Sequence, residues 1–125
     1  DLWACGDPII DDRDGQSYNT VQIGAQCWMA ENLNYGSMVH SSVIPSNNGI
    51  VEKYCLNDVA TNCDIYGGHY MWDELMEYST MESTQGICPT GWHVPSDAEW
   101  FTMENFVDPT IDDPTVTYYR GIDEG

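Results

Sequence analysis

The chain has 125 residues, of which 42% are hydrophobic, and its 21 acidic side chains face only three basic ones, for a formal net charge of −18. This length predicts one domain with a modest core, and the hydrophobic content argues against a disordered chain. So negative a surface repels phosphate backbones and anionic lipids, and no apolar run is long enough to span a bilayer, so neither a nucleic-acid partner nor membrane insertion is expected.

The first predicted element is a three-stranded antiparallel β-meander. An Asp-Gly turn signal at 14–15 opens a β-branched and aromatic run over 17–23. A Gly-Ala pair at 24–25 closes this run before a second apolar run at 27–29. Ile9 and Ile10 lie on the other side of the Asp-Gly turn, so a first short strand can pair with the second.

The middle of the chain predicts a surface loop over 34–49, a short strand over 50–55 and an amphipathic helix over about 69–79. The helix is predicted because apolar residues recur at intervals of three and four. We assign this stripe to the core, with three acidic residues outside. The apolar set is Met71, Trp72, Leu75, Met76 and Tyr78, and the acidic set is Asp73, Glu74 and Glu77.

A second helix is predicted over about 97–107. Ser96 and Glu99 form a Ser-x-x-Glu capping box at its start, and Asp108-Pro109 ends it. Its inner side is predicted to bury Ala98, Phe101 or Met103, and Phe106. Residues 108–125 are expected to be irregular or an edge strand, with a weak strand signal at 115–119.

Five cysteines suggest an oxidising, extracellular setting, and their spacing fits no zinc-binding pattern. Cys55 and Cys63 enclose a short loop, so a disulfide between them is geometrically easy. Cys5 precedes the first strand and Cys27 lies on the third, which makes them the second predicted pair. Cys88 is left unpaired or available for an intermolecular bond.

Three long blocks, over residues 14–35, 54–72 and 85–100, resemble the Fibrobacter succinogenes major paralogous domain (FISUMP) family. The first reads Asp-Gly-x-x-Tyr-x-Thr-Val-x-Ile-Gly, followed by Gln-x-Trp-Met-Ala-Glu-Asn-Leu-Asn-Tyr. The resemblance implies a secreted or surface protein of Bacteroidetes-type bacteria. It also implies a small α+β fold, distantly similar to C-type lectins and formylglycine-generating enzymes.

The resemblance also bears on domain organisation. Family members continue through Gly- and Trp-rich strands to a final cysteine, a part that this chain does not match. We therefore expect one domain over 1–125 that is incomplete at its C-terminus, in which Cys88 lacks the partner that the family would supply.

The acidic residues before Gly15 are the candidate metal site. Asp11, Asp12 and Asp14 resemble part of a Ca²⁺-binding loop, although the terminal Glu of such a loop is missing. A solvated hairpin turn is the competing interpretation. Ca²⁺ is the only cofactor that the sequence suggests.

Trp3, Tyr35, Tyr118 and Tyr119 are the candidate ligand-binding residues, because periodic patterns assign Trp28, Trp72 and Trp100 to the core. Such aromatic side chains could stack on a sugar.

Cys88 and His93 are the candidate nucleophile and base, but Cys-Pro-x-Gly-Trp is also a structural turn of lectin-like folds. We predict no catalytic residue, because the catalytic cysteines of formylglycine-generating enzymes belong to a later region that this chain does not match.

These observations predict a non-enzymatic, extracellular structural or adhesive module of the bacterial surface, in a filament or a surface layer, that assembles with copies of itself or with other surface proteins. The alternative is a lectin-like domain that binds carbohydrate or another ligand, with or without Ca²⁺. The chain has no Asn-x-Ser/Thr acceptor for N-linked glycans.

Overall fold

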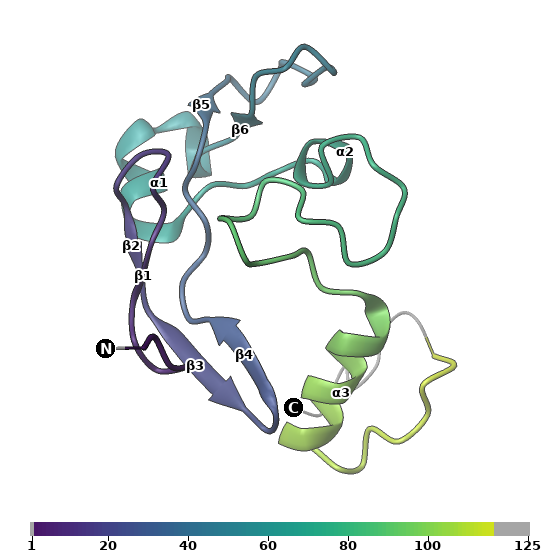
Figure 1. The fold of residues 1–125 in the computed structure, drawn as a ribbon. Helices are drawn as coiled ribbons and strands as arrows, with labels where there is room; N and C mark the ends of the chain where they lie inside the picture. The colour runs from purple at the N-terminus through teal and green to yellow at the C-terminus, as the bar shows by residue number, and fades with distance from the viewer. Residues whose placement is uncertain (1, 117–125) are drawn as a thin grey trace.

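The structure is a computed structural model that describes residues 2–116. Short strands and short helices alternate with long loops, so the chain mixes α and β structure as predicted (Figure 1). The elements are β1 Ile9–Ile10, β2 Ser17–Tyr18, β3 Thr20–Ile23, β4 Gln26–Met29, β5 Ser37–Met38, β6 Glu52–Lys53, the 3₁₀ turn η1 Leu56–Asp58, α1 Ala60–Tyr66, α2 Trp72–Leu75 and α3 Asp97–Val107.

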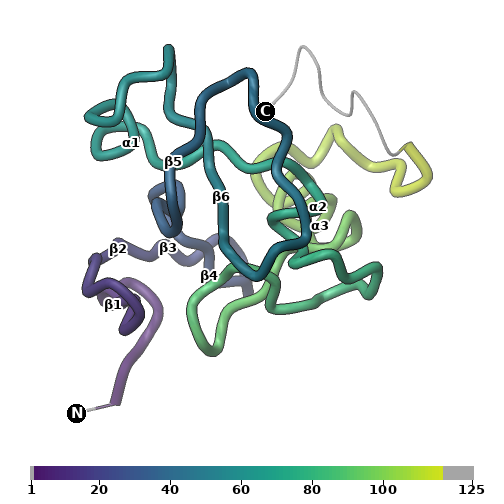
Figure 2. Tube along the Cα trace, turned by 90° about the horizontal axis from the view of Figure 1, so that it is seen from above, coloured from purple at the N-terminus to yellow at the C-terminus, as the bar shows by residue number. Residues whose placement is uncertain are grey.

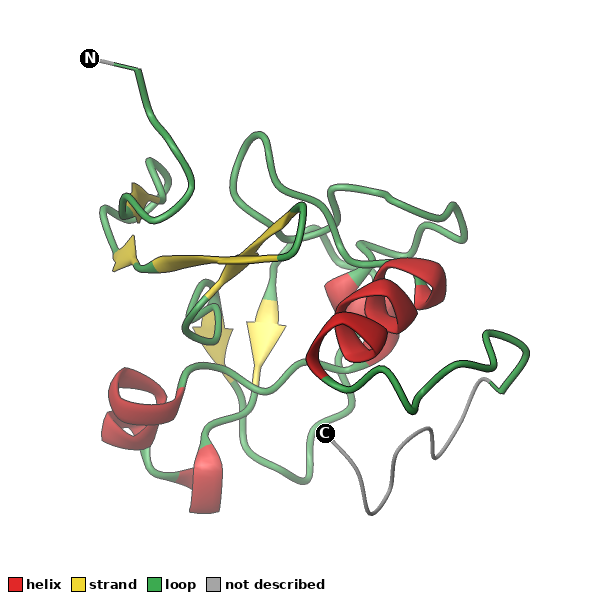
Figure 3. Cartoon of the chain, turned by 90° about the horizontal axis from the view of Figure 1, so that it is seen from below, coloured by secondary structure: helices red, strands yellow, loops and turns green. Residues whose placement is uncertain are grey.

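The strands pair two by two, which corrects the prediction of one three-stranded meander (Figure 3). β1 pairs antiparallel with β2, and β3 pairs antiparallel with β4. Asn19 separates the pairs, because its backbone N–H donates to the Glu31 carboxylate (3.1 Å) and not to a neighbouring strand. The chain therefore changes partner at Asn19 instead of extending a single sheet.

Gly24 allows the tight turn between β3 and β4. Its φ of 62° is one that residues with a side chain rarely adopt, and Ile23 pairs directly with Gln26 across the two-residue turn that was predicted at 24–25. A Cβ atom at Gly24 would lie 3.1 Å from the ring of Phe106. The hairpin and the end of α3 therefore pack together at a position that favours glycine.

The strand predicted over 50–55 is the two-residue β6, which pairs in parallel with β5. The helix α1 was not predicted. It follows η1 directly, and the Cys55–Cys63 disulfide, with Cα atoms 5.0 Å apart, joins the residue before η1 to the middle of α1. The loop that the sequence suggested between these cysteines is therefore largely helical.

The helix predicted over 69–79 is wrong in length, because α2 has only four residues. Glu77 and Tyr78 have positive φ angles of 49° and 60°, which end the helix. Glu74 was predicted to face solvent but is buried, where its carboxylate accepts hydrogen bonds from the Glu52 backbone N–H (2.7 Å) and the Tyr78 hydroxyl (2.9 Å). Trp72 was predicted in the core but is 61% exposed.

The helix α3 has the predicted bounds and the predicted capping box. The Ser96 hydroxyl accepts from the Glu99 N–H, and the Glu99 carboxylate accepts from the Ser96 N–H. Its predicted inner face is wrong, since none of its residues is buried, Ala98 is exposed and Phe106 is 63% exposed. Thr115 and Val116 are not in a strand, and the remainder of the predicted 115–119 strand lies outside the described residues.

The core is small and contains buried polar groups. Figure 2 shows β1 and β2 on one side of the molecule and α2 and α3 on the other. Within residues 2–116 the buried apolar side chains are Tyr18, Cys55, Cys63, Met76, Ile87, Val94 and Ile111. Several of them meet where the end of α2 lies beside residues 84–87, because the Ile87 N–H donates to the Leu75 carbonyl (3.0 Å).

Candidate functional site

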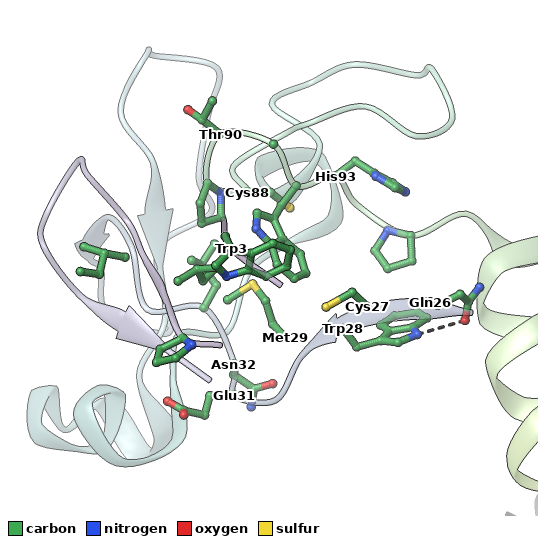
Figure 4. Close-up of a pocket in the computed structure, with 18 of the residues that line it drawn as sticks. Trp3, Gln26, Cys27, Trp28, Met29, Glu31, Asn32, Cys88, Thr90 and His93 are labelled. Atoms are coloured by element: carbon green, nitrogen blue, oxygen red, sulfur yellow. Dashed lines mark hydrogen bonds between the residues drawn. The ribbon is translucent and has the colours of Figure 1, made fainter. Parts of the chain in front are cut away.

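An open groove of about 1120 Å³ lies between β4 and residues 88–95. All four residues of β4 line it, and so do four of the five tryptophans of the chain: Trp3, Trp28, Trp92 and Trp100. Figure 4 shows Cys27, Trp28 and Met29 of β4 below Trp3, Cys88 and His93. We name this hollow the aromatic groove.

The predicted disulfide between Cys5 and Cys27 builds one end of the aromatic groove. Its Cα atoms lie 5.8 Å apart, so the N-terminal segment is attached covalently to β4. This attachment brings Trp3 to the groove, where its ring meets the edge of Trp92 at a centroid distance of 6.1 Å and an angle of 82°. Trp3 remains 50% exposed, so its ring is available to a ligand.

The contact between β4 and α3 builds the other end. The rings of Trp28 and Trp100 lie 4.8 Å apart, and the Gln26 side-chain amide donates to the Glu99 carbonyl (3.1 Å). The Trp28 indole N–H donates to the Gln26 side-chain oxygen (3.0 Å), as the dashed line in Figure 4 marks. Because Ser96 fixes the start of α3, it also positions Trp100 over β4.

The ionisable side chains that line the groove are predominantly acidic. Asp12 and Glu31 are exposed, and Glu99 accepts a hydrogen bond from His93 (2.8 Å). The hydrogen bond from the Ser96 backbone N–H is the main cause that holds the pKa of Glu99 below its ordinary value. Among the described residues that line the groove there is no lysine or arginine.

Both basic side chains within residues 2–116 have partners inside the molecule. Arg13 donates to both carboxylate oxygens of Asp11 (2.8 and 2.6 Å) and to the Ile87 carbonyl (2.8 Å), and its guanidinium lies 3.8 Å from the ring centroid of Tyr35. Lys53 donates to the Asn34 carbonyl and side-chain oxygen (3.2 and 2.7 Å). Neither cation is therefore left to neutralise the acidic surface.

The predicted metal residues do not come together as a site. Asp11 is fully buried and bonded to Arg13, whose side-chain hydrogen bonds are the main cause that lowers the pKa of Asp11. Asp14 accepts from the Gln16 backbone and side chain, as in a hydrogen-bonded turn. Nowhere in residues 2–116 do three or more His, Cys, Asp or Glu side chains gather to hold a metal ion.

The structure separates the four predicted ligand-binding residues. Trp3 lines the aromatic groove, whereas Tyr35 lies under the Arg13 guanidinium and does not line it. Tyr118 and Tyr119 lie outside the described residues.

The prediction missed Trp28 and Trp100, which it assigned to the core. Trp100 is 43% exposed and Trp28 is partly exposed. A helical or strand pattern marks an apolar face, but it does not reveal whether another element covers that face.

Cys88 and His93, the candidate nucleophile and base, both line the groove. Burial raises the pKa of the Cys88 thiol to about 11, so it is protonated at neutral pH. The His93 ring is hydrogen-bonded to the Glu99 carboxylate. A protonated thiol is a weak nucleophile.

A family model described as the Fibrobacter succinogenes major domain matches residues 21–125. No curated protein and no solved structure matches the chain. In the described part of the chain, no helix has the length and apolar character needed to cross a membrane.

Proposed function

Because this chain belongs to the Fibrobacter succinogenes major domain family, we propose that it is a non-enzymatic structural module of the bacterial cell surface that assembles through protein–protein contacts. The partners are other surface proteins or copies of the same chain, in an adhesive layer or a filament.

The observation that carries this proposal is the imbalance between exposed and buried apolar side chains. Within residues 2–116, 18 large hydrophobic side chains are exposed and only seven hydrophobic residues are buried. Single exposed apolar residues are common, but tryptophans gathered in one groove are typical of a surface that a partner covers. Trp3 and Trp100 are the two most suitable anchors, since aromatic side chains dominate binding energy at interfaces.

Two disulfides support an extracellular location, because such bonds persist in oxidising compartments. The raised pKa of Cys88 supports a role without catalysis.

Sedimentation and electron microscopy of the purified chain over a range of concentrations test for self-assembly. Fluorescence anisotropy with labelled peptides tests for contacts with other proteins. We expect binding in at least one assay, and Trp100→Ala should weaken it about tenfold or more, since the loss of an aromatic anchor commonly costs over 1.4 kcal/mol. Trp72→Ala, which removes an exposed tryptophan outside the groove, is the matched control. A chain that stays monomeric and binds no peptide would refute the proposal.

The composition of the groove also favours a second candidate, a lectin-like domain that binds a glycan. Aromatic rings can stack on sugar rings, and the side chains of Gln26, Glu31 and Asn32 in the same groove could bond to hydroxyl groups. A glycan array with and without EDTA tests this candidate and any dependence on Ca²⁺. An array without signal would remove it.

A further inference from the structure

One edge of β4 carries backbone groups that β3 does not use. The Ala30 N–H donates to the Asn19 carbonyl (2.8 Å), and hydrogen-bonded and non-hydrogen-bonded pairs alternate along an antiparallel ladder. Trp28 is therefore in a hydrogen-bonded pair with Val21, whereas Cys27 and Met29 are in non-hydrogen-bonded pairs. The N–H and C=O groups of Cys27 and Met29 consequently point away from β3.

This outer edge of β4 lies along the aromatic groove. All four successive β4 residues line the groove, although side chains alternate between the two faces of a strand, so the groove follows the strand edge. Within residues 2–116, neither Cys27 nor Met29 has a backbone hydrogen bond on this side. An open strand edge is a template for the addition of another strand.

The charge of the chain makes a second copy a poor occupant of this edge. Two of its three basic residues, Arg13 and Lys53, are bonded inside the molecule, and only Arg120, outside the described residues, remains. Copies with a formal charge of −18 repel each other. A partner with positive charge instead meets the carboxylates of Asp12 and Glu31 at the groove.

We propose that the β4 edge binds an extended segment of a different protein, in which Lys or Arg alternates with apolar residues. The segment adds a strand to Cys27 and Met29, its apolar side chains contact the groove tryptophans, and its cations pair with Asp12 and Glu31. This inference rests on the proposed function and specifies the partner and the contact surface.

The probe is a fluorescent peptide in which lysine and leucine alternate, measured by fluorescence anisotropy with the full chain. We expect its dissociation constant to rise about fivefold from about 50 to about 300 mM NaCl, because salt screens the charge pairing. A glutamate–leucine peptide should not bind. A lysine–leucine peptide that is N-methylated at alternate residues should bind at least about tenfold more weakly, because it cannot donate hydrogen bonds to the β4 edge.

Two variant pairs locate the contact. Asp12→Asn with Glu31→Gln should weaken peptide binding about threefold and flatten its salt dependence. Glu82→Gln with Asp112→Asn removes the same charge from exposed positions outside the groove and should have little effect. Hydrogen exchange of the Cys27 and Met29 amides should slow when the peptide binds.

The direction of the salt effect separates the outcomes. If the chain self-associates more strongly as salt rises and protects the same two amides, a second copy occupies the edge; this inference is then overturned while the proposed function stands. If the N-methylated peptide binds as well as its parent, strand addition is overturned. If no peptide binds, no assembly forms and only glycans bind, the proposed function itself fails.

Discussion

The N-terminal region over residues 5–35 and the helix α3 are held in the fold by different means. A disulfide, two strand pairs and the Arg13 contacts hold the first, and they reach residues as distant as Ile87. The helix begins with a local capping box, buries none of its own residues and meets the hairpin through exposed or partly exposed rings. Long-range bonds therefore stabilise one end of the aromatic groove, and a local capping box begins the helix at the other end.

Loss of the disulfides should lower the free energy of unfolding more than any other change. Cys5→Ser with Cys27→Ser should lower the free energy of unfolding by about 3 kcal/mol, and Cys55→Ser with Cys63→Ser by slightly less, because its loop is shorter. Urea unfolding followed by tryptophan fluorescence measures both losses. In the Cys5/Cys27 variant, hydrogen exchange should accelerate in β3 and β4 but not in α3. Equal acceleration in α3 would mean that the two regions form one cooperative unit.

The Arg13→Met substitution should have the next largest effect and lower the free energy of unfolding by about 3 kcal/mol. It leaves the buried Asp11 carboxylate without its partner and removes the bond to the Ile87 carbonyl. The Arg13 side chain is 27% exposed, so solvent relieves part of the cost. Asp11→Asn in the Arg13→Met background should recover part of the stability, because it removes the unpaired charge. If the two substitutions lower the free energy of unfolding additively in this double-mutant cycle, the pairing of Arg13 with Asp11 does not stabilise the fold.

Ser96→Ala should destabilise α3, at the other end of the groove, by about 1 kcal/mol, since it removes the acceptor for the Glu99 N–H. Circular dichroism should report a lower helix content, and groove binding should weaken because Trp100 is less well positioned. Ser46→Ala, at an exposed loop position, is the control and should change neither quantity. Unchanged helix content in Ser96→Ala would show that tertiary contacts, not the cap, maintain α3.

Mild acid should have the smallest effect on the stability of the folded chain. The pKa of Asp11 lies below its ordinary value of 3.8 in the folded chain, so its contribution to stability is present above that value and is lost as the pH falls through the folded pKa. Urea midpoints between about pH 5 and pH 3 should therefore decline less in Arg13→Met than in the natural chain. Parallel declines would mean that other carboxyl groups, such as Glu99, dominate the acid response.

The elements that local chemistry determines were predictable from the sequence. The bounds of α3 follow from Ser96 at one end and Asp108-Pro109 at the other, and the two-residue hairpin turn follows from Gly24. The Cys55–Cys63 disulfide was predicted from the short loop between the two cysteines, and the Cys5–Cys27 disulfide from their positions relative to the strands. The structure contains both.

The elements that depend on distant contacts were not predictable. Residues 60–66 include several weak helix formers, and a disulfide stabilises this helix. The early end of α2 coincides with the burial of Glu74 beside Glu52, which no helical pattern signals. Of the predicted ligand-binding residues only Trp3 was placed in the candidate site within the described residues, because it is the fold that brings residues 26–29 and 88–100 to the same groove.

The bond between Arg13 and the Ile87 carbonyl joins residues 74 positions apart, which has a consequence for the order of folding. During synthesis the early segment emerges long before its acceptor exists, and closing so large a loop is slow. The guanidinium can pair with Asp11 at once, but its last partner, the Ile87 carbonyl, arrives only after a further 74 residues. A nascent chain stalled before that point would keep this end of the protein accessible to proteases and oxidoreductases.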